Sequence, residues 1–181
     1  GSAPGTLEHI GKKRVEEVKI TIHDYDEDHI KTIEISDIEE CRPYLEKPTK
    51  TWINVQGLHD IEKLKSIWAY FNLHPLVQED ILNTSQRPKV EEYDENMFIV
   101  LRMLQYTNED PRALEAEQIS IVLGENYVLS FQESEVPHFA PVLDRLKIVG
   151  TRLRRLGPDY LTYALIDNIV DYYFSVLNKL G

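Results

Sequence analysis

"VEEYDENMFIVLRMLQY", residues 90–106, is followed by "EQISIVLGENYVLSF", residues 117–131, and these two stretches indicate the fold class most directly. Each contains two runs rich in β-branched and aromatic residues, separated by a short polar group. The polar groups are Asp94-Glu95-Asn96 and Gly124-Glu125-Asn126. Polar residues between such runs are typical of turns, so the pattern predicts four strands that form two hairpins.

Three more strands are expected upstream. Residues 18–23 and 30–35 alternate apolar and polar side chains, and the acidic residues 24–28 between them indicate a connection. Residues 51–57, "TWINVQG", have the same β-rich character. The N-terminal part of the chain is therefore predicted to consist of strands.

Helices are predicted on both sides of the hairpin region. Residues 60–71 have apolar side chains at helical spacing behind Asp60, and His74-Pro75 opens a short helix that ends near Asn83. Helical spacing returns in residues 137–149 and in the long run 159–180. The apolar stripe of that run is Leu161, Leu165, Ile169, Tyr173, Val176 and Leu180. This order predicts a mixed sheet with helices on its faces, in an α+β or three-layer αβα arrangement.

The chain has 181 residues, enough for one domain, and its 42% hydrophobic and 28% charged residues are typical of a soluble globular protein. Twenty Lys and Arg stand against 31 Asp and Glu, so the formal net charge at pH 7 is -11. Nucleic-acid binding depends on basic surfaces that neutralise phosphate. The charge balance therefore disfavours a nucleic-acid partner and favours cations.

Cys41 is the one cysteine, which excludes a disulfide within the chain and favours a reducing compartment. The apolar runs are far shorter than the ~20 residues that span a bilayer, so the chain as given is expected to be soluble. Residues 1–3, Gly-Ser-Ala, are interpreted as the remnant of a cleaved tag. Because the last residues follow directly on a helical run, we expect a fragment of a longer protein.

The acidic pair Glu79 and Asp80 lies inside the short segment "HPLVQEDILN", residues 74–83. On a helical wheel each of the two falls between apolar residues, so neither lies on a clean polar face. A carboxylate held away from water without a partner is costly, which predicts a cation beside at least one of them. The pattern leaves open whether that cation is Arg87, Lys89 or a metal ion.

Asp167 and Asp171, in "LIDNIVDYYF", are four residues apart and therefore share one helix face. Two like charges at this spacing cost a helix about 0.2 to 0.5 kcal/mol unless a cation lies near them. Magnesium would suit them, since it prefers oxygen ligands and takes only one or two carboxylates directly. The alternative is that both residues belong to the solvated stripe of an amphipathic helix.

The sequence contains no other motif for catalysis or metal binding. Its six histidines lack the HxxxH or HExxH spacing of a catalytic zinc site, and no GxxxxGK[ST], GxGxxG or GxSxG occurs. His74 is interpreted as a helix cap, and the basic stretch 145–157 as a solvated helix and turn without a role. An enzyme is therefore disfavoured.

Four blocks occur in an order and at a spacing that resemble the cytosolic N-terminal region of CorA-type magnesium transport proteins. They are "TWINVQGLHD", "FNLHPLVQEDILNTSQRPKVEEYDENMFIVLRML", "EQISIVLGENYVLSFQE" and "DYLTYALIDNIVDYYF". The similarity runs from "PGTLEHIGKK", which begins at residue 4, to residue 181. It implies an α+β protein, a three-layer αβα sandwich with a mixed, roughly seven-stranded sheet.

The resemblance also implies how the chain is organised. The cytosolic αβα domain would span residues 4–157, and residues 158–181 would begin a long helical region. A stalk, two transmembrane segments and a Gly-Met-Asn pore motif would follow, and would attach the domain to the cytoplasmic side of the inner membrane. The whole protein would be a homopentamer.

The resemblance implies two cation sites between subunits. Asp80 matches the position that faces a stalk aspartate of the neighbouring subunit, and Glu79 and Asp167 match a second, weaker site with Asp171 at its edge. Ser85 stands where some members have a histidine near the second site, which departs from the family's pattern.

The implied function is a sensor of divalent cations that holds the pore closed when magnesium is sufficient. Magnesium would be the regulatory ion, with cobalt, nickel, calcium or zinc able to take its place. Facing carboxylates repel one another when bare, and a bound cation converts this repulsion into a bridge. The alternatives are the cytosolic domain of a zinc or cobalt/nickel transporter and, more distantly, a magnesium-dependent phosphohydrolase that uses Glu79, Asp80 and Asp167.

Overall fold

Seven strands form a single mixed sheet in the order β2-β1-β3-β7-β6-β5-β4. We describe a computed structural model, which covers residues 6–10, 17–106 and 112–180; the expected tag remnant at residues 1–3 lies outside them. The strands are β1 (Lys19–Tyr25), β2 (Ile30–Ile35), β3 (Lys50–Gln56), β4 (Lys89–Glu92), β5 (Met97–Tyr106), β6 (Leu114–Leu123) and β7 (Tyr127–Gln132). β3 and β7 pair in parallel, and every other neighbouring pair is antiparallel.

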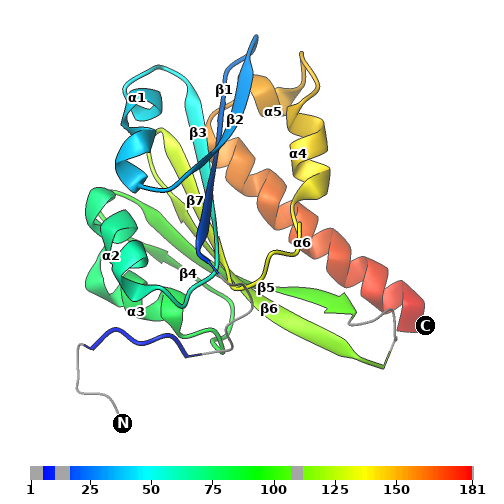
Figure 1. Cartoon of the computed structure of the whole chain (residues 1–181). Coiled ribbons are helices and arrows are strands. Elements are labelled where there is room, and N and C mark those ends of the chain that lie inside the picture. Colours follow the sequence, from blue (N-terminus) through cyan, green and yellow to red (C-terminus); the bar gives the residue numbers. More distant parts are fainter. Residues whose placement is uncertain (1–5, 11–16, 107–111, 181) are drawn as a thin grey trace.

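Helices cover both faces of the sheet, as Figure 1 shows. On one face lie η1 (Ile38–Cys41), α1 (Arg42–Leu45), α2 (Ile61–Tyr70) and α3 (Pro75–Leu82). On the other lie α4 (Ala140–Leu146), α5 (Arg152–Arg155) and α6 (Pro158–Leu180). The predicted α+β class and three-layer arrangement are confirmed.

Strand β5 explains why the run "MFIVLRM" is apolar almost throughout. Successive side chains of a strand point to opposite faces, so both faces of a strand between two helical layers are buried. Phe98 and Val100 belong to the core beneath α2 and α3, whereas Ile99 and Met103 belong to the core beneath α6. All four are at most 3% exposed.

The predicted elements occur close to the expected residues. The β4–β5 and β6–β7 pairs are antiparallel neighbours, as the two predicted hairpins require, and β5 also pairs with β6. The side chain of Asp60 caps α2 by accepting the amide of Lys63 at 3.2 Å. In α6, Leu161, Leu165 and Ile169 of the predicted stripe are fully buried. No helix among the described residues has the length and apolar character needed to cross a membrane.

The prediction of a solvated basic stretch at residues 145–157 is wrong for Arg154. This side chain is 1% exposed. Its Nε donates to the carbonyl of Asp26 at 2.7 Å, and its Nη1 donates to that of Leu146 at 3.1 Å. The guanidinium therefore joins the β1–β2 turn to the end of α4, and this is a structural role that charge patterning could not indicate.

The pH dependence of stability should report on buried His23 in β1. Its Nδ1 lies 2.9 Å from Thr32 Oγ1, its ring centre lies 4.9 Å from that of Trp52 in a tilted arrangement, and the residue is 5% exposed. Burial, aided by the charge of Lys147, lowers the pKa of His23 from 6.5 to about 4. The unfolded chain therefore takes up the proton first as the pH falls, and stability is lost between these two values.

We predict that His23 alone lowers the free energy of unfolding by about 2 kcal/mol between pH 7 and pH 5. Urea denaturation at several pH values measures this slope. His23→Gln should flatten it, while His29→Gln, at an exposed position, should leave it unchanged. Equal slopes in the unmodified chain and His23→Gln would contradict the assignment.

Candidate metal-binding site

The short helix α3 carries the acidic pair and has a well-defined start. His74 Nδ1 accepts a hydrogen bond from the amide of Leu76 at 3.1 Å, and Pro75 occupies the first helical position. The predicted capping role of His74 is thereby confirmed. Val77 and Ile81 are fully buried and hold the helix against the sheet.

Glu79 and Asp80 differ in their environments. Glu79 is exposed to solvent. Leu76, its apolar neighbour on the helical wheel, is 54% exposed and so does not bury it. Within the described residues the Glu79 side chain forms no hydrogen bond or ion pair. Asp80 is half-buried and points from α3 toward β4. One of the two carboxylates, that of Asp80, is thus partly buried against the rest of the protein, as the wheel predicted.

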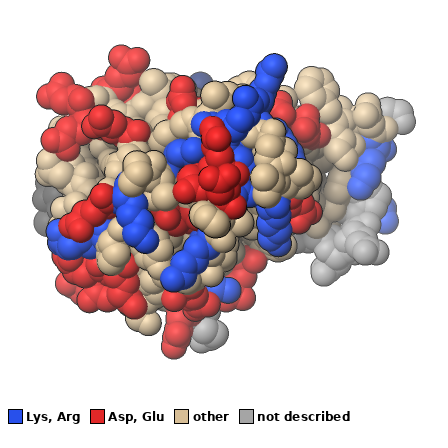
Figure 2. Space-filling model, turned by 90° about the horizontal axis from the view of Figure 1, so that it is seen from above, with Lys and Arg blue, Asp and Glu red and all other residues tan. Residues whose placement is uncertain are grey.

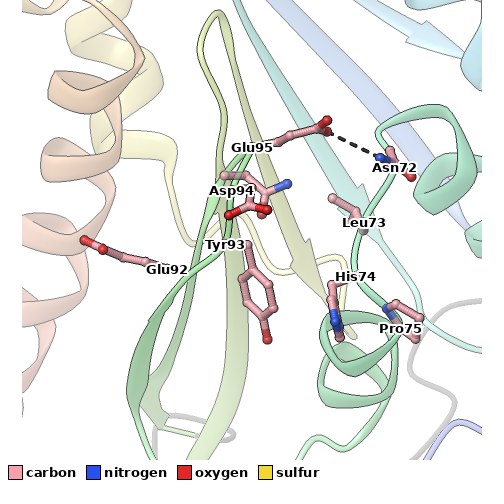
Figure 3. A pocket seen from close by; sticks show the side chains of 9 residues that line it. Asn72, Leu73, His74, Pro75, Glu92, Tyr93, Asp94 and Glu95 are labelled. Atoms are coloured by element: carbon pink, nitrogen blue, oxygen red, sulfur yellow. Dashed lines mark hydrogen bonds between the residues drawn. The ribbon is translucent and has the colours of Figure 1, made fainter.

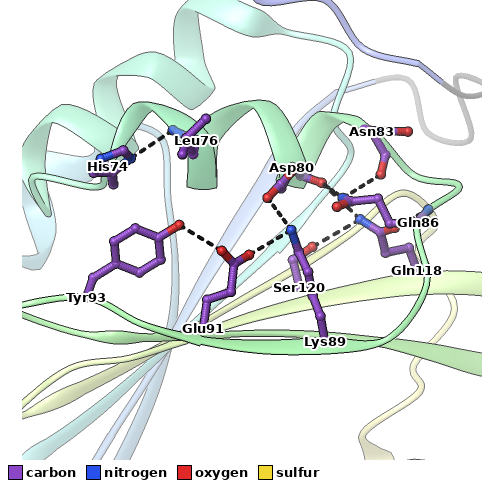
Figure 4. Close-up of polar contacts among 10 residues, drawn as sticks. All are labelled: His74, Leu76, Asp80, Asn83, Gln86, Lys89, Glu91, Tyr93, Gln118 and Ser120. Atoms are coloured by element: carbon purple, nitrogen blue, oxygen red, sulfur yellow. Dashed lines mark hydrogen bonds and ion pairs between the residues drawn. The ribbon is translucent and has the colours of Figure 1, made fainter.

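Lys89 is the cation beside Asp80. Its Nζ lies 2.6 Å from Asp80 Oδ2 and 2.7 Å from Glu91 Oε1, so one ammonium group bridges α3 and the edge strand β4 (Figure 4). Tyr93 Oη donates to the other oxygen of Glu91 at 3.4 Å. Of the two basic residues that the sequence offered, the structure selects Lys89, and Arg87 is exposed.

Charge pairing outweighs burial at this bridge. Burial alone would lower the pKa of Lys89, but its hydrogen bonds to Asp80 and Glu91 raise that pKa above its ordinary value. The hydrogen bond from Lys89 likewise holds the pKa of Glu91 below its usual range. Lys89 and Glu91 are therefore both charged at neutral pH.

Two glutamines fix the backbone at Asp80. The carbonyl oxygen of Asp80 accepts hydrogen bonds from Gln86 Nε2 at 2.5 Å and from Gln118 Nε2 at 3.1 Å. Gln118 lies in β6 and is 2% exposed. These contacts tie the last turn of α3 to the sheet and hold the carboxylate in a defined position. Sequence patterning did not predict these contacts, because an amide partner leaves no periodic pattern.

A groove of about 250 Å³ runs beside the acidic pair. The described N-terminal segment 6–10 forms one wall of it, and Ile10 bridges in parallel to Asn83 at the end of α3. His9 Nε2 pairs with Glu133 Oε2 at 3.0 Å and anchors this segment. Ser85, the position of the family's occasional histidine, donates to Asn83 Oδ1 at 3.2 Å.

Asp167 and Asp171 lie on α6, on the opposite face of the sheet from α3. Asp167 is half-buried and Asp171 is exposed, and neither has an ion pair among the described residues. Asn168 between them donates to the carbonyl of His138 at 2.9 Å and fixes the helix there. The structure therefore does not bring these aspartates together with Glu79 or Asp80 within one chain.

A second hollow, of about 420 Å³, lies between the start of α3 and the β4–β5 turn (Figure 3). It is lined by Glu92, Asp94 and Glu95, and Asn72 Nδ2 donates to Glu95 at 3.5 Å. Figure 3 shows Glu92 pointing away from the hollow, so these acids do not converge. Acidic and basic side chains are also interspersed on the face seen in Figure 2.

The donor set suits a hard divalent cation but is incomplete. Carboxylate oxygens are the ligands that magnesium and calcium prefer. Within the part of the chain that the structure describes, no three His, Cys, Asp or Glu side chains lie close enough together to hold a metal ion. The described residues of one chain therefore do not form a complete metal site by themselves.

The sequence of residues 49–181 matches the family model described as "CorA-like Mg2+ transporter protein". The chain belongs to this CorA-like family. It is 41% identical over 180 residues to the cobalt/magnesium transport protein CorA of Thermotoga maritima, which covers 99% of this chain and 51% of that protein. The chain thus spans about half the length of this relative.

Solved structures support the CorA-like fold. The soluble domain of CorA from Methanocaldococcus jannaschii superposes with a TM-score of 0.59 at 18% identity, covering 88% of this chain and 59% of that one. The cytoplasmic domain of ZntB from Vibrio parahaemolyticus gives a TM-score of 0.60 at 15% identity, covering 88% and 63%. At these identities the similarity concerns the fold.

We predict that this CorA-like chain alone binds divalent ions weakly, with a dissociation constant of about a millimolar or higher. The reason is that Asp80 already has a cationic partner and the other acids lie apart. Calorimetric titration with MgCl₂ measures the affinity, and Asp80→Asn serves as the reference. A tight site with one ion per chain would overturn this expectation.

Proposed function

We propose that this chain is the cytosolic, cation-sensing domain of a CorA-type magnesium transporter, and that divalent ions bound between subunits favour the closed pore. The observation that carries the proposal is the placement of the acids in two incomplete sets on opposite faces, Glu79 and Asp80 on α3 and Asp167 and Asp171 on α6. Membership of the CorA-like family supports it.

The placement of the acids on opposite faces of the domain suits a ring of identical copies. A contact between two different surfaces of identical copies is heterologous, and it closes into a ring when the rotation allows. Glu79 of one copy would then meet Asp167 of the next, with Asp171 at the edge of that site. Asp80 would face an aspartate of a segment beyond residue 181, in the half of the relatives that this chain does not cover. We propose a homopentamer.

The proposed switch is electrostatic. Carboxylates that face each other across a subunit boundary repel when no cation lies between them, which favours separation of the copies. A divalent cation supplies the opposite charge and stabilises the assembled state. Its effect is limited to the difference between its affinities for the closed and open states, so several equivalent sites are needed for a decisive change.

The proposed ion is magnesium, and cobalt is the first alternative because the Thermotoga relative is named for both. Nickel, calcium and zinc would also be accepted by oxygen ligands to different extents. The fold is shared with a ZntB domain, so the fold does not by itself select the transported ion. The relatives are named as transport proteins, and we propose no enzymatic activity.

We predict that Asp80→Asn in the full-length product of the gene raises the internal magnesium concentration needed for closure by about tenfold or abolishes closure. Glu79→Gln and Asp167→Asn should have smaller effects, because these residues belong to the second site, which is proposed to be the weaker one. Fluorescent magnesium indicators in liposomes loaded with different magnesium concentrations measure the flux.

Glu62→Gln is the matched control, since Glu62 is an exposed helical carboxylate whose partner is Lys65 at 3.6 Å. It removes the same charge outside the proposed sites. Inhibition by internal magnesium that is the same in Asp80→Asn and in the unmodified protein would refute the role of Asp80.

A further inference from the structure

Lys89 occupies the position that a cation at Asp80 would take. Its ammonium lies 2.6 Å from Asp80 Oδ2, while Oδ1 makes no hydrogen bond within the described residues. The side chains of Lys89 and Asp80 are 32% and 23% exposed, so the pair is only partly screened by solvent. A divalent ion bound to the same carboxylate would meet a positive charge already in place.

The ammonium is held from three sides. Asp80 and Glu91 bind it, and it lies 5.9 Å from the centre of the Phe98 ring beneath. Lys89 itself belongs to β4, whose pairing with β5 fixes the backbone. Because Gln86 and Gln118 hold the backbone of Asp80, the ion pair joins two positioned groups and is not a chance surface contact.

We propose that Lys89 is a tethered competitor that sets the affinity of Asp80 for divalent cations. This inference rests on the proposed function, since it concerns regulation of the same site. A divalent ion and an ammonium group near one carboxylate repel each other, so binding requires Lys89 to move away from Oδ2. Only molecules in which Lys89 has left Asp80 bind the ion at this carboxylate. The apparent affinity for the ion is therefore the intrinsic affinity multiplied by the fraction of such molecules.

Glu91 gives the displaced ammonium a second partner. Its carboxylate lies 2.7 Å from Lys89 Nζ and is steadied by Tyr93, so Lys89 keeps one ion pair after it leaves Asp80. Displacement therefore does not leave a partly buried charge unpaired, which would be costly. The exchange between Lys89 and the ion is reversible, as a sensor requires.

The test uses the 181-residue chain and Mn²⁺, which prefers the same oxygen ligands as magnesium and broadens NMR signals near it. Broadening of the amide signals of residues 79–83 gives an apparent dissociation constant. Lys89→Met should tighten it about three- to fivefold, the range of a partly exposed ion pair. Lys89→Gln repeats the test with a polar side chain, and thermal unfolding verifies that both variants fold.

Lys65→Met is the matched control. It also removes one positive charge from an ion pair with a carboxylate, in this case Glu62 on α2. Because the net charge changes equally, any gain that is seen in Lys89→Met and not in Lys65→Met belongs to the Asp80 site. In Asp80→Asn the substitution Lys89→Met should have no further effect on broadening.

The outcomes separate the two proposals. If Asp80→Asn weakens Mn²⁺ binding while Lys89→Met and Lys89→Gln bind no more tightly than Lys65→Met, the competition is refuted and the sensing role of Asp80 survives. If Asp80→Asn leaves the broadening of residues 79–83 unchanged, the ion does not use Asp80, and the proposed site fails together with the competition.

Discussion

The parallel pairing of β3 with β7 holds the two parts of the sheet together. It joins the antiparallel group β2-β1-β3 to the antiparallel group β7-β6-β5-β4. A buried polar contact reinforces it, since Trp52 Nε1 donates to Ser130 Oγ at 2.8 Å and Ser130 Oγ donates to Asn54 Oδ1 at 2.7 Å. Buried donors and acceptors must be paired, so these contacts also specify the register. The two halves of the chain form one sheet through this single seam.

This topology determines where the acidic pair lies. The chain leaves β3 at the centre of the sheet and next enters β4 at the far edge, so the connection has to cross the face of β7, β6 and β5. The helices α2 and α3 make that crossing, and α3 ends above β4, where Asp80 meets Lys89. On the other face, buried Glu117 of β6 pairs with His138 at 2.9 Å, and the carbonyl of His138 binds Asn168 of α6. The candidate residues on both faces are thus positioned by contacts to the sheet.

The sequence pattern predicted the strands and the longer helices, but it did not reveal the shortest helices. η1, α1 and α5 have four residues each and complete barely one helical turn, so no apolar repeat can mark them. In β4 the apolar side chain faces solvent and the charged ones face the protein. Val90 is 63% exposed, while Lys89 and Glu91 turn toward α3. Inward charges protect an edge strand from pairing with other chains. Here the carboxylate of Asp80 pairs with the inward-facing ammonium of Lys89. The sequence pattern left Lys89 as one of three candidates, beside Arg87 and a metal ion, because spacing does not reveal which side of a strand faces a helix.

The position of Lys89 beside Asp80 also bears on the ion selectivity of the proposed site. The bare site is not an open pair of negative charges, since Asp80 is neutralised by an ammonium that is always present at high local concentration. A monovalent cation offers no more charge than Lys89 and loses to the tethered group. Under the proposed function, a divalent cation offers twice the charge and would gain from a second carboxylate across the subunit boundary, which the single ammonium cannot bridge in the same way. Under the proposed function, the internal ion pair would therefore make the domain respond to divalent ions against a large excess of monovalent ones, at the cost of a weaker individual site.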